Sequence, residues 1–274
     1  MQTEADKLEK LNMQLRKAKR IVVAFSGGVD SSVLLKAARD VLGKENVIAI
    51  TACSELLPAE ELADAKTVAK LADAQHLLVE AHDLDDADVV RNDKNRCYYC
   101  KRRRFSMLVD WAREHGFPYV ADGTNVDDTG DYRPGMKAIA ELHPYVISPL
   151  AEAGWGKADI RRQAKAWGLP VWDKPSAACL ASRVAYDIPL SAQKLHAIAR
   201  VEQFIHQCVP QKGQLRVRHH GNLARIEADE TLLAGIFAAR KEIQAFALQE
   251  GFLYVTLDLA AYRMGSQNAV LAKV

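Results

Sequence analysis

The chain has 274 residues, of which 49% are apolar and 26% are charged, and its formal net charge is +2. These are the values of an ordinary globular protein with a sizeable core, and they exclude the strongly basic composition of a protein held to nucleic acid by charge alone. No apolar run is long enough to cross a bilayer and the N-terminus is charged, so the sequence predicts a cytoplasmic protein that does not associate with membranes.

The first half of the chain alternates between predicted helices and short apolar strands. Leu8, Leu11 and Leu15 have helical spacing within residues 4–19, and the apolar run Arg20–Phe25 stops at glycines, as buried parallel strands often do. Further strands are expected at 47–52, 76–79 and 118–121, and further helices at 31–42, 58–72 and 99–115. This alternation predicts an α/β domain whose parallel sheet is covered on both faces.

The pattern changes after Pro149. Helices are expected at 155–167, 191–207 and 229–249, and strands at 214–219, 222–228 and 252–257. This order predicts a second, smaller α+β domain. We therefore expect one domain over residues 1–170 and another over residues 171–274.

A glycine-rich loop joins the first predicted strand to the helix that follows it. Gly27 and Gly28 allow a tight turn and a close approach of the backbone to a ligand, and the amides and hydroxyls at the helix start can hold phosphate oxygens. The lysine of a Walker A loop is absent. A plain strand–helix turn would explain the two glycines but not the whole heptapeptide Ser26–Ser32, so the loop predicts a phosphate site.

This heptapeptide resembles the PP-loop of the ATP-pyrophosphatase superfamily, which has the adenine nucleotide alpha-hydrolase-like fold. Its members use ATP to adenylate a carboxylate or carbonyl oxygen and release pyrophosphate. The resemblance implies that pyrophosphate is gripped by Ser26, Gly27, Gly28, Ser31 and Ser32. It also implies that Asp30 lies beside the pyrophosphate and acts through magnesium.

The same resemblance indicates where the rest of ATP binds. Thr51, at the end of the second strand, would lie near the adenosine, and so would Gly123 and Asn125 after the fourth strand, at the carboxyl edge of the sheet. Asp127 and Asp128 follow in the same loop. They are candidates for assisting the metal, although acidic loop residues are usually only solvated.

Five cysteines make an odd count in a chain expected to be cytoplasmic, where disulfides are disfavoured. Cys97 and Cys100 are three residues apart at the start of a predicted helix, and the basic run 101–104 follows them, which favours thiolates. With Cys179 they could hold three irons of a 4Fe–4S cluster, although the same thiolates permit zinc or a redox pair. Cys53 and Cys208 are expected to be buried thiols.

Four motifs in the second half of the chain, at residues 175–183, 216–218, 224–227 and 262–266, resemble the LarE family. LarE is the ATP-dependent sulfur transferase of nickel-pincer cofactor synthesis, and the resemblance covers nearly the whole chain. It implies a small-molecule substrate, pyridinium-3,5-biscarboxylic acid mononucleotide, whose carboxylates are adenylated and then converted to thiocarboxylates. It also implies a homohexamer.

Within the LarE family, Cys179 corresponds to a cysteine that one type sacrifices as sulfur donor, leaving dehydroalanine. The additional Cys97 and Cys100 depart from that single-cysteine pattern. They favour the type in which three thiolates hold a 4Fe–4S cluster and a labile sulfide is transferred, with sacrifice of the Cys179 sulfur as the alternative. Arg183, which follows Cys179 closely, is a candidate for steadying the adenylate.

Arg216 and Arg218 are candidates for binding the substrate phosphate. Two residues apart on a predicted strand, their side chains leave the same face about 6.6 Å apart and could clamp a phosphate between two guanidinium groups. Arg263 is a third candidate. Glu202 and Glu227 could orient these arginines or lie near the reacting carboxylate; the alternative is a solvated basic face paired with the same two glutamates.

Three other functional classes are compatible with parts of the sequence. A tRNA-thiolating PP-loop enzyme would need a large basic surface, which the small net charge does not provide. An amide-forming ligase would leave the three cysteines unexplained. A non-enzymatic ATP-sensing iron–sulfur or zinc regulator is the third alternative.

Overall fold

The computed structural model describes residues 3–130, 134–175 and 178–273, and the chain divides into two compact units. The first unit contains residues 1–81 and 97–177, and the second contains residues 82–96 and 178–274. Segment 82–96, which we call the strap, therefore belongs with the C-terminal residues, although both of its chain neighbours belong to the first unit. The sequence instead predicted a single boundary at residue 170, which would place the whole strap in the first domain.

The first unit is built on a five-stranded parallel sheet with the order β3-β2-β1-β4-β5. Its strands are β1 (Ile21–Ala24), β2 (Val47–Cys53), β3 (Gln75–Glu80), β4 (Tyr119–Ala121) and β5 (Val146–Ile147). The expected α/β architecture is confirmed. Sequence reasoning missed β5, because two residues are too few to carry a strand pattern.

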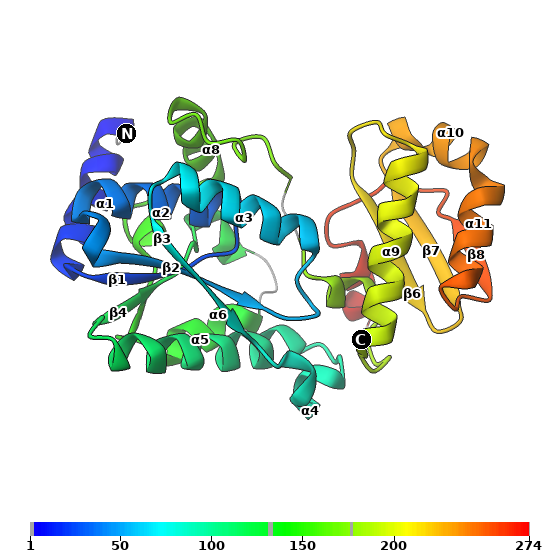
Figure 1. The fold of residues 1–274 in the computed structure, drawn as a ribbon, viewed down its shortest axis with the longest axis horizontal. Coiled ribbons are helices and arrows are strands. Elements are labelled where there is room, and N and C mark those ends of the chain that lie inside the picture. The colour runs from blue at the N-terminus through cyan, green and yellow to red at the C-terminus, as the bar shows by residue number, and fades with distance from the viewer. Residues whose placement is uncertain (1–2, 131–133, 176–177, 274) are drawn as a thin grey trace. The chain divides into compact units, whose positions relative to one another are not determined.

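Helices cover both faces of this sheet (Figure 1). On one face lie α1 (Glu4–Ala18), α2 (Val29–Leu42), α3 (Ala59–Leu71), α7 (Pro149–Glu152) and α8 (Lys157–Ala166). On the other lie α5 (Arg96–Glu114) and α6 (Pro134–Glu141). Because side chains alternate along a strand, Val23 of β1 packs on the first face while Val22 packs on the second.

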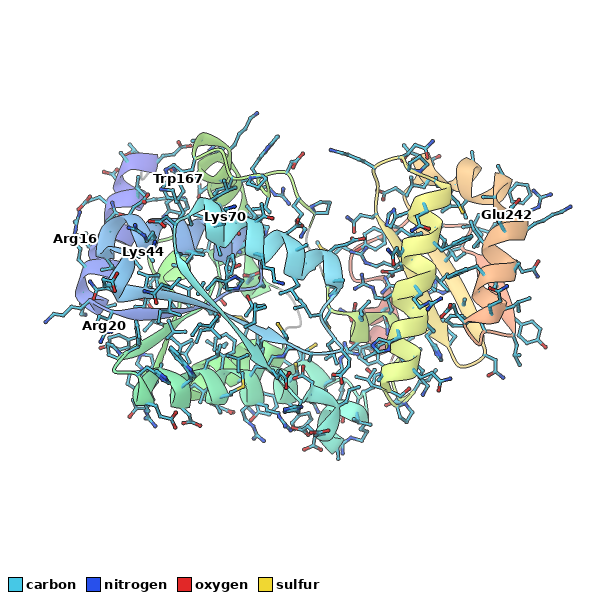
Figure 2. The ribbon with its side chains drawn as sticks, viewed as in Figure 1. Arg16, Arg20, Lys44, Lys70, Trp167 and Glu242 are labelled. Atoms are coloured by element: carbon cyan, nitrogen blue, oxygen red, sulfur yellow. The ribbon has the colours of Figure 1, made fainter. Side chains whose placement is uncertain are left out.

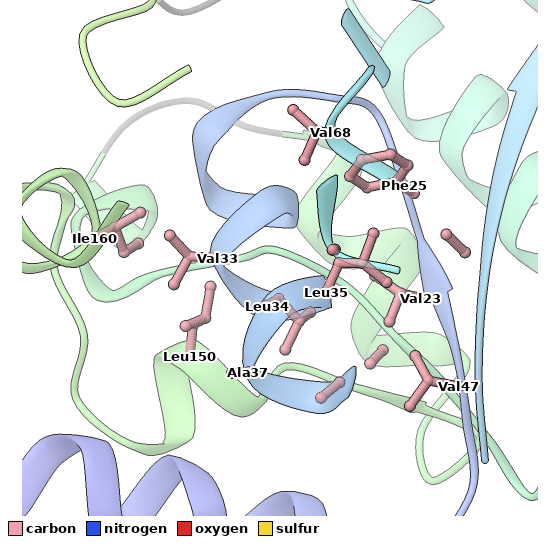
Figure 3. Close-up of a cluster of buried hydrophobic side chains, with 14 of the residues drawn as sticks. Val23, Phe25, Val33, Leu34, Leu35, Ala37, Val47, Val68, Leu150 and Ile160 are labelled. Atoms are coloured by element: carbon pink, nitrogen blue, oxygen red, sulfur yellow. The ribbon is translucent and has the colours of Figure 1, made fainter. Parts of the chain in front are cut away.

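The core beneath α2 holds the start of that helix firmly in place (Figure 3). Val33, Leu34 and Leu35 are fully buried against side chains such as Val23 and Val47. Burying each such side chain stabilises the fold by about 1.5–3 kcal/mol. Charged residues such as Arg16, Lys44 and Lys70 lie instead at the surface of this unit (Figure 2).

The second unit has a three-stranded sheet with the order β6-β7-β8, in which β6 and β7 are antiparallel and β7 and β8 are parallel. Its strands are β6 (Leu215–His220), β7 (Leu223–Ala228) and β8 (Tyr254–Leu257), and its main helices are α9 (Ala192–Cys208), α10 (Glu230–Ala238) and α11 (Arg240–Gln249). The strap contributes the short helix α4 (Ala87–Val90). The expected smaller α+β domain is thus present.

One helix expected at 229–249 is two helices that meet at Ala239. The buried positions Leu232, Ile236, Ile243 and Ala247 keep helical spacing across the junction, so the sequence carries no signal for the break. In the part of the chain that the structure describes, no helix combines the length and apolarity needed to span a membrane.

Candidate active site

The glycine loop turns from β1 into α2 as the sequence predicts. Gly27 has φ +75°, and a Cβ atom on it would lie 2.8 Å from the backbone nitrogen of Ala65 in α3. Gly28 is the N-cap of α2. The first amides of α2 have no carbonyl one turn earlier in the helix, so they point outward where an anion could bind.

Hydroxyl groups line the same turn. Ser26 Oγ and Ser31 Oγ are 3.1 Å apart, and Ser26 Oγ also accepts a hydrogen bond from the Gly28 amide at 3.3 Å. Ser32 Oγ donates to the Gly28 carbonyl at 2.8 Å and is fully buried. Ser26, by contrast, is exposed. Of the three serines it has the hydroxyl most accessible to a phosphate.

Asp30 joins the loop to two distant segments. Its Oδ2 atom lies 2.5 Å from Lys157 Nζ, at the first residue of α8, and its Oδ1 atom accepts a hydrogen bond from Asn125 Nδ2 at 3.4 Å. Gly123 packs so closely that a Cβ atom there would lie 3.0 Å from the Ser31 amide nitrogen. The carboxyl end of β4 and the start of α2 thus form one polar site.

The two carboxylates that follow Asn125 make local backbone contacts. Asp127 Oδ2 accepts the Lys157 amide at 2.6 Å at the start of α8, and Asp128 Oδ2 accepts the Asn125 amide at 3.1 Å. Both carboxylates therefore order the loop. Asp30 remains the carboxylate closest to the glycine turn and the best placed to meet a phosphate-bound cation.

Thr51 is buried at the end of β2 and links it to β1. Its Oγ1 atom donates to the Phe25 carbonyl at 2.7 Å and lies 2.8 Å from His76 Nε2. Because the hydroxyl proton is already used, His76 donates to Thr51. Burial lowers the pKa of His76, which favours the neutral ring.

All five cysteines are thiols in the structure. Cys97 is exposed and Cys100 is half-buried, one turn apart on α5 in the first unit, whereas Cys179 is half-buried just before a short 3₁₀ turn (Leu180–Arg183) in the second unit. Across residues 3–130, 134–175 and 178–273, no three His, Cys, Asp or Glu side chains form a group suited to a metal. Cys53 and Cys208, expected from the sequence to be buried, are half-buried, and this partial burial raises the pKa of each thiol.

The sheet of the second unit has one apolar and one charged face. Leu215, Val217 and His219 of β6 are buried on the face that α9 and α11 cover. Arg216 and Arg218 lie on the other face, opposite Glu227 and Arg225 of β7. The two candidate arginines therefore share a face, as the strand period predicts.

The two arginines differ in their partners. Arg218 is buried, and its guanidinium binds Glu227 Oε2 at 2.7 and 2.9 Å. Arg216 donates to the Leu215 carbonyl at 2.6 Å and to Gln214 Oε1 at 2.8 Å, and its guanidinium carbon lies 5.4 Å from the centre of the Tyr262 ring. The sequence did not show which arginine would pair with Glu227, and in the structure it is Arg218.

The remaining candidates of this unit also have defined contacts. Arg183 is buried and pairs with Glu202, whose Oε1 atom also accepts the Val217 amide at 2.9 Å. Glu227 additionally pairs with Arg225 at 2.8 Å. Arg263 is exposed. Glu227 thus pairs with the candidate Arg218, whereas Glu202 pairs with Arg183 and not with any of the three candidate phosphate-binding arginines.

Comparison with known proteins identifies the family. Residues 1–132 match a family model described as a PP-loop domain. An uncharacterized protein of Synechocystis sp. is 40% identical over 97% of this chain and 98% of its own length. The pyridinium-3,5-bisthiocarboxylic acid mononucleotide synthase of Lactiplantibacillus plantarum is 35% identical over 100% of this chain and 98% of its own length. The chain belongs to the LarE-type family of PP-loop proteins.

As a LarE-type protein, the chain is an ATP-dependent enzyme of the ATP-pyrophosphatase type. A tRNA-specific 2-thiouridylase of Pelobacter propionicus is also similar, at 30% identity, but over only 57% of this chain and 52% of its own length. The likeness to tRNA-thiolating enzymes is therefore partial, while the likeness to the synthase extends over both units.

Sequence reasoning missed three polar residues that the structure brings to these sites. Lys157 was not connected to Asp30, Arg96 of the strap was not connected to the turn that carries Cys179, and Asn92 was not connected to the segment that follows this turn. Each contact joins residues more than 80 positions apart in the chain. A pattern within a short stretch of sequence cannot predict a contact between residues so far apart in the chain.

Proposed function

We propose that this LarE-type enzyme adenylates the carboxylates of pyridinium-3,5-biscarboxylic acid mononucleotide and converts them to thiocarboxylates. The observation that carries the proposal is the similarity over the full chain to a synthase named for the bisthiocarboxylic acid product. The glycine turn at the start of α2, with its outward amides and the exposed Ser26 hydroxyl, supports the ATP-dependent half of the reaction.

Adenylation removes the chemical obstacle to sulfur insertion. A carboxylate is a poor electrophile because its carbon carries no good leaving group. Attack of the carboxylate oxygen on the α-phosphate of ATP expels pyrophosphate and leaves an acyl adenylate. A sulfur nucleophile then attacks the acyl carbon and expels AMP. In this scheme the glycine turn would hold the departing pyrophosphate, and Asp30 is the residue that would hold a magnesium ion, which would offset part of the charge of the pyrophosphate.

Arg216 is the side chain we assign to the substrate phosphate. It makes no ion pair with a carboxylate among the described residues, whereas Arg218 and Arg183 each pair with a glutamate. Burial lowers the pKa of Arg216 and the charge of Arg183 acts in the same direction, while the charge of Glu202 acts against them. A guanidinium that is partly desolvated and lies near other cations favours an anionic partner.

For the sulfur source we favour a 4Fe–4S cluster on Cys97, Cys100 and Cys179, which would supply an inorganic sulfide to the acyl adenylate. The spacing of Cys97 and Cys100, one helical turn apart on α5, fits two ligand positions of such a cluster. Cys179 of the second unit would have to provide the third.

The alternative is that Cys179 itself donates the sulfur. Its thiolate would displace AMP to form a thioester. Loss of the Cys179 Cα proton with cleavage of the Cβ–S bond would then release the thiocarboxylate and leave dehydroalanine. This route gives one transfer per chain, whereas a replaceable sulfide allows repeated turnover.

The function is tested by incubating the anaerobically purified full chain with ATP, magnesium, sulfide and the biscarboxylic acid mononucleotide. We expect pyrophosphate release that depends on the mononucleotide, and a product 16 Da heavier for each oxygen replaced by sulfur. Pyrophosphate release that depends on ammonia, without sulfur in the product, would instead identify an amide-forming ligase. Incorporation of sulfur into bulk tRNA would identify a tRNA-thiolating enzyme.

A further inference from the structure

The turn that carries Cys179 is held through its backbone carbonyls. We call residues 178–182 the Cys179 turn. Arg183 Nη1 donates to the Ala178 and Cys179 carbonyls, the latter at 3.0 Å. Arg218 Nη1 donates to the Ser182 carbonyl at 2.9 Å, and Arg96 Nη1 donates to the Ala181 carbonyl at 2.9 Å. Four of the five carbonyls in the turn thus accept a hydrogen bond from an arginine.

These three arginines are buried: Arg96 and Arg183 are 4% exposed and Arg218 is 6% exposed. A guanidinium remains charged in a protein and has five N–H donors in a rigid plane, so one group can hold several acceptors at once. Hydrogen bonds from charged donors are stronger than those from neutral ones. The turn also has internal bonds, since the Ser182 amide donates to the Cys179 carbonyl at 3.0 Å and the Val184 amide donates to the Ala181 carbonyl at 3.2 Å. The arginines therefore anchor a short 3₁₀ turn from outside, through the same carbonyls.

Arg96 differs from the other two because it belongs to the strap. Its guanidinium also donates to Asn92 Oδ1. Asn92 is fully buried, and its Nδ2 atom donates to the Ala185 and Ile188 carbonyls, both at 2.9 Å. Arg96 and Asn92 thus form a polar clasp between the strap and the segment that follows Cys179.

Arg96 is also covalently joined to Cys97 and is the first residue of α5. Its side chain holds the turn that contains Cys179, and its backbone leads directly into the helix that contains Cys97 and Cys100. The clasp belongs to the second unit, whereas the glycine turn of the ATP site belongs to the first. The clasp can therefore affect sulfur delivery without taking part in adenylation.

We propose that Arg96 is a positioning residue for sulfur transfer, whose guanidinium fixes the Cys179 turn through the Ala181 carbonyl. The inference rests on the proposed function. Without the guanidinium, the turn loses one of its anchors and the Cys179 thiol becomes less well oriented. A misplacement of about 1 Å in a reacting group can cost about 100-fold in rate.

The test compares Arg96→Met and Arg96→Lys with Arg91→Met, an exposed arginine of the same strap. The first measurement is the yield of thiocarboxylate per pyrophosphate released. A variant that is merely less well folded loses both products equally and keeps this ratio. We expect the ratio to fall about tenfold in Arg96→Met and less in Arg96→Lys, which keeps one charged donor, and to stay at the wild-type value in Arg91→Met. An unchanged ratio in Arg96→Met would overturn the proposal.

The second measurement needs neither ATP nor substrate. Alkylation of Cys179 by iodoacetamide, followed by peptide mass analysis, should be several-fold faster in Arg96→Lys than in wild type or Arg91→Met, because the turn is less restrained. Equal rates would contradict the role of Arg96 even if Arg96→Met failed to fold. If wild type forms no thiocarboxylate, the proposed function fails, and the alkylation rates still decide whether Arg96 holds the turn.

Discussion

Asp30 and Lys157 illustrate how a single contact can define the charge of a nucleotide site. The carboxylate lies one residue past the N1 position of α2, where phosphate groups would approach, and the ammonium of Lys157 is 2.5 Å from it. A carboxylate without a cation would repel the triphosphate. We therefore expect Lys157 to keep the site receptive to ATP until magnesium arrives with the nucleotide.

Replacing Lys157 by Met should raise the KM for ATP by about tenfold, because it removes about 1.4 kcal/mol or more of favourable electrostatic interaction. Pyrophosphate release at varied ATP concentrations measures this effect. Lys174→Met is the matched control, because Lys174 is another ion-paired lysine of the first unit. Its partners are the carboxylates of Glu61 and Asp64. Equal effects of the two substitutions would assign Lys157 to general stability.

Arg216→Ala should weaken binding of the mononucleotide by about tenfold to 100-fold, the range of about 1.5–3 kcal/mol for a hydrogen bond to a charged group. The KM for ATP should change little, because Arg216 lies in the second unit and the glycine turn in the first. Arg200→Ala, which removes an exposed partner of Glu250, is the control. A parallel loss of affinity for both ligands would remove the phosphate assignment.

At the scale of elements, the glycine turn depends on the helix that packs over it. Gly27→Ala should cost more stability than Gly168→Ala, although both residues have positive φ, +75° and +67°. A left-handed conformation costs a non-glycine residue about 1–2 kcal/mol. At Gly27 the new methyl group must also displace the backbone of α3 at Ala65, whereas nothing lies within 4 Å of a Cβ atom at Gly168. Urea denaturation measures the loss of stability in each variant. Equal losses would show that α3 can shift away from the new methyl group without a measurable cost.

The sheet of the second unit should lose stability in mild acid. His219 is buried on β6, its Nδ1 atom has no hydrogen-bond partner in the described structure, and burial lowers its pKa from the ordinary value of 6.5. Below that value the unfolded chain binds more protons than the folded one. The contribution of His219 is therefore complete above pH 6.5 and is lost as the pH falls towards its folded pKa.

The measurement is the free energy of unfolding between pH 7 and pH 5. In His219→Leu we expect this free energy to fall less between pH 7 and pH 5 than it does in wild type, because leucine cannot take up a proton in the unfolded state. His196→Gln, an exposed histidine on α9, is the control. A slope identical to that of wild type in His219→Leu would mean that other groups cause the loss.

At the scale of the whole molecule, the proposed chemistry draws on both units. The ATP loop, Cys97 and Cys100 belong to the first unit, whereas Cys179 and Arg216 belong to the second. The strap makes the second unit discontinuous in sequence, so the two units alternate along the chain. Thiols from both would be needed for a cluster with three protein ligands.

Anaerobically purified wild-type protein should therefore contain iron and inorganic sulfide near four of each per chain. Cys97→Ala and Cys179→Ala should each lose both elements, and Cys208→Ala should retain them. Zinc in place of iron would exclude sulfide transfer from a cluster. A mass decrease of the intact chain by about 34 Da after turnover, one hydrogen sulfide, would instead show that Cys179 is consumed.

Local patterns in the sequence determined the elements that carry the nucleotide loop. Continuous apolar runs predicted β1, β2 and β4, because a strand buried on both faces needs apolar side chains at every position. Ser26–Ser32 predicted the turn between β1 and α2, because two adjacent glycines allow a tight turn and the helix that follows begins with amides that point outward. The period of a strand likewise predicted that Arg216 and Arg218 share one face of β6.

The tertiary structure alone decided which of these residues meet. Asp30 lies beside Lys157, 127 positions away, and Arg96 beside Ala181, 85 positions away. Likewise, Arg218 is committed to Glu227 while Arg216 is not, although the two arginines look alike in the sequence. Propensity and periodicity describe neighbours along one element. Charge pairing and burial depend on which elements the folded chain brings together, so they are fixed only when the units form.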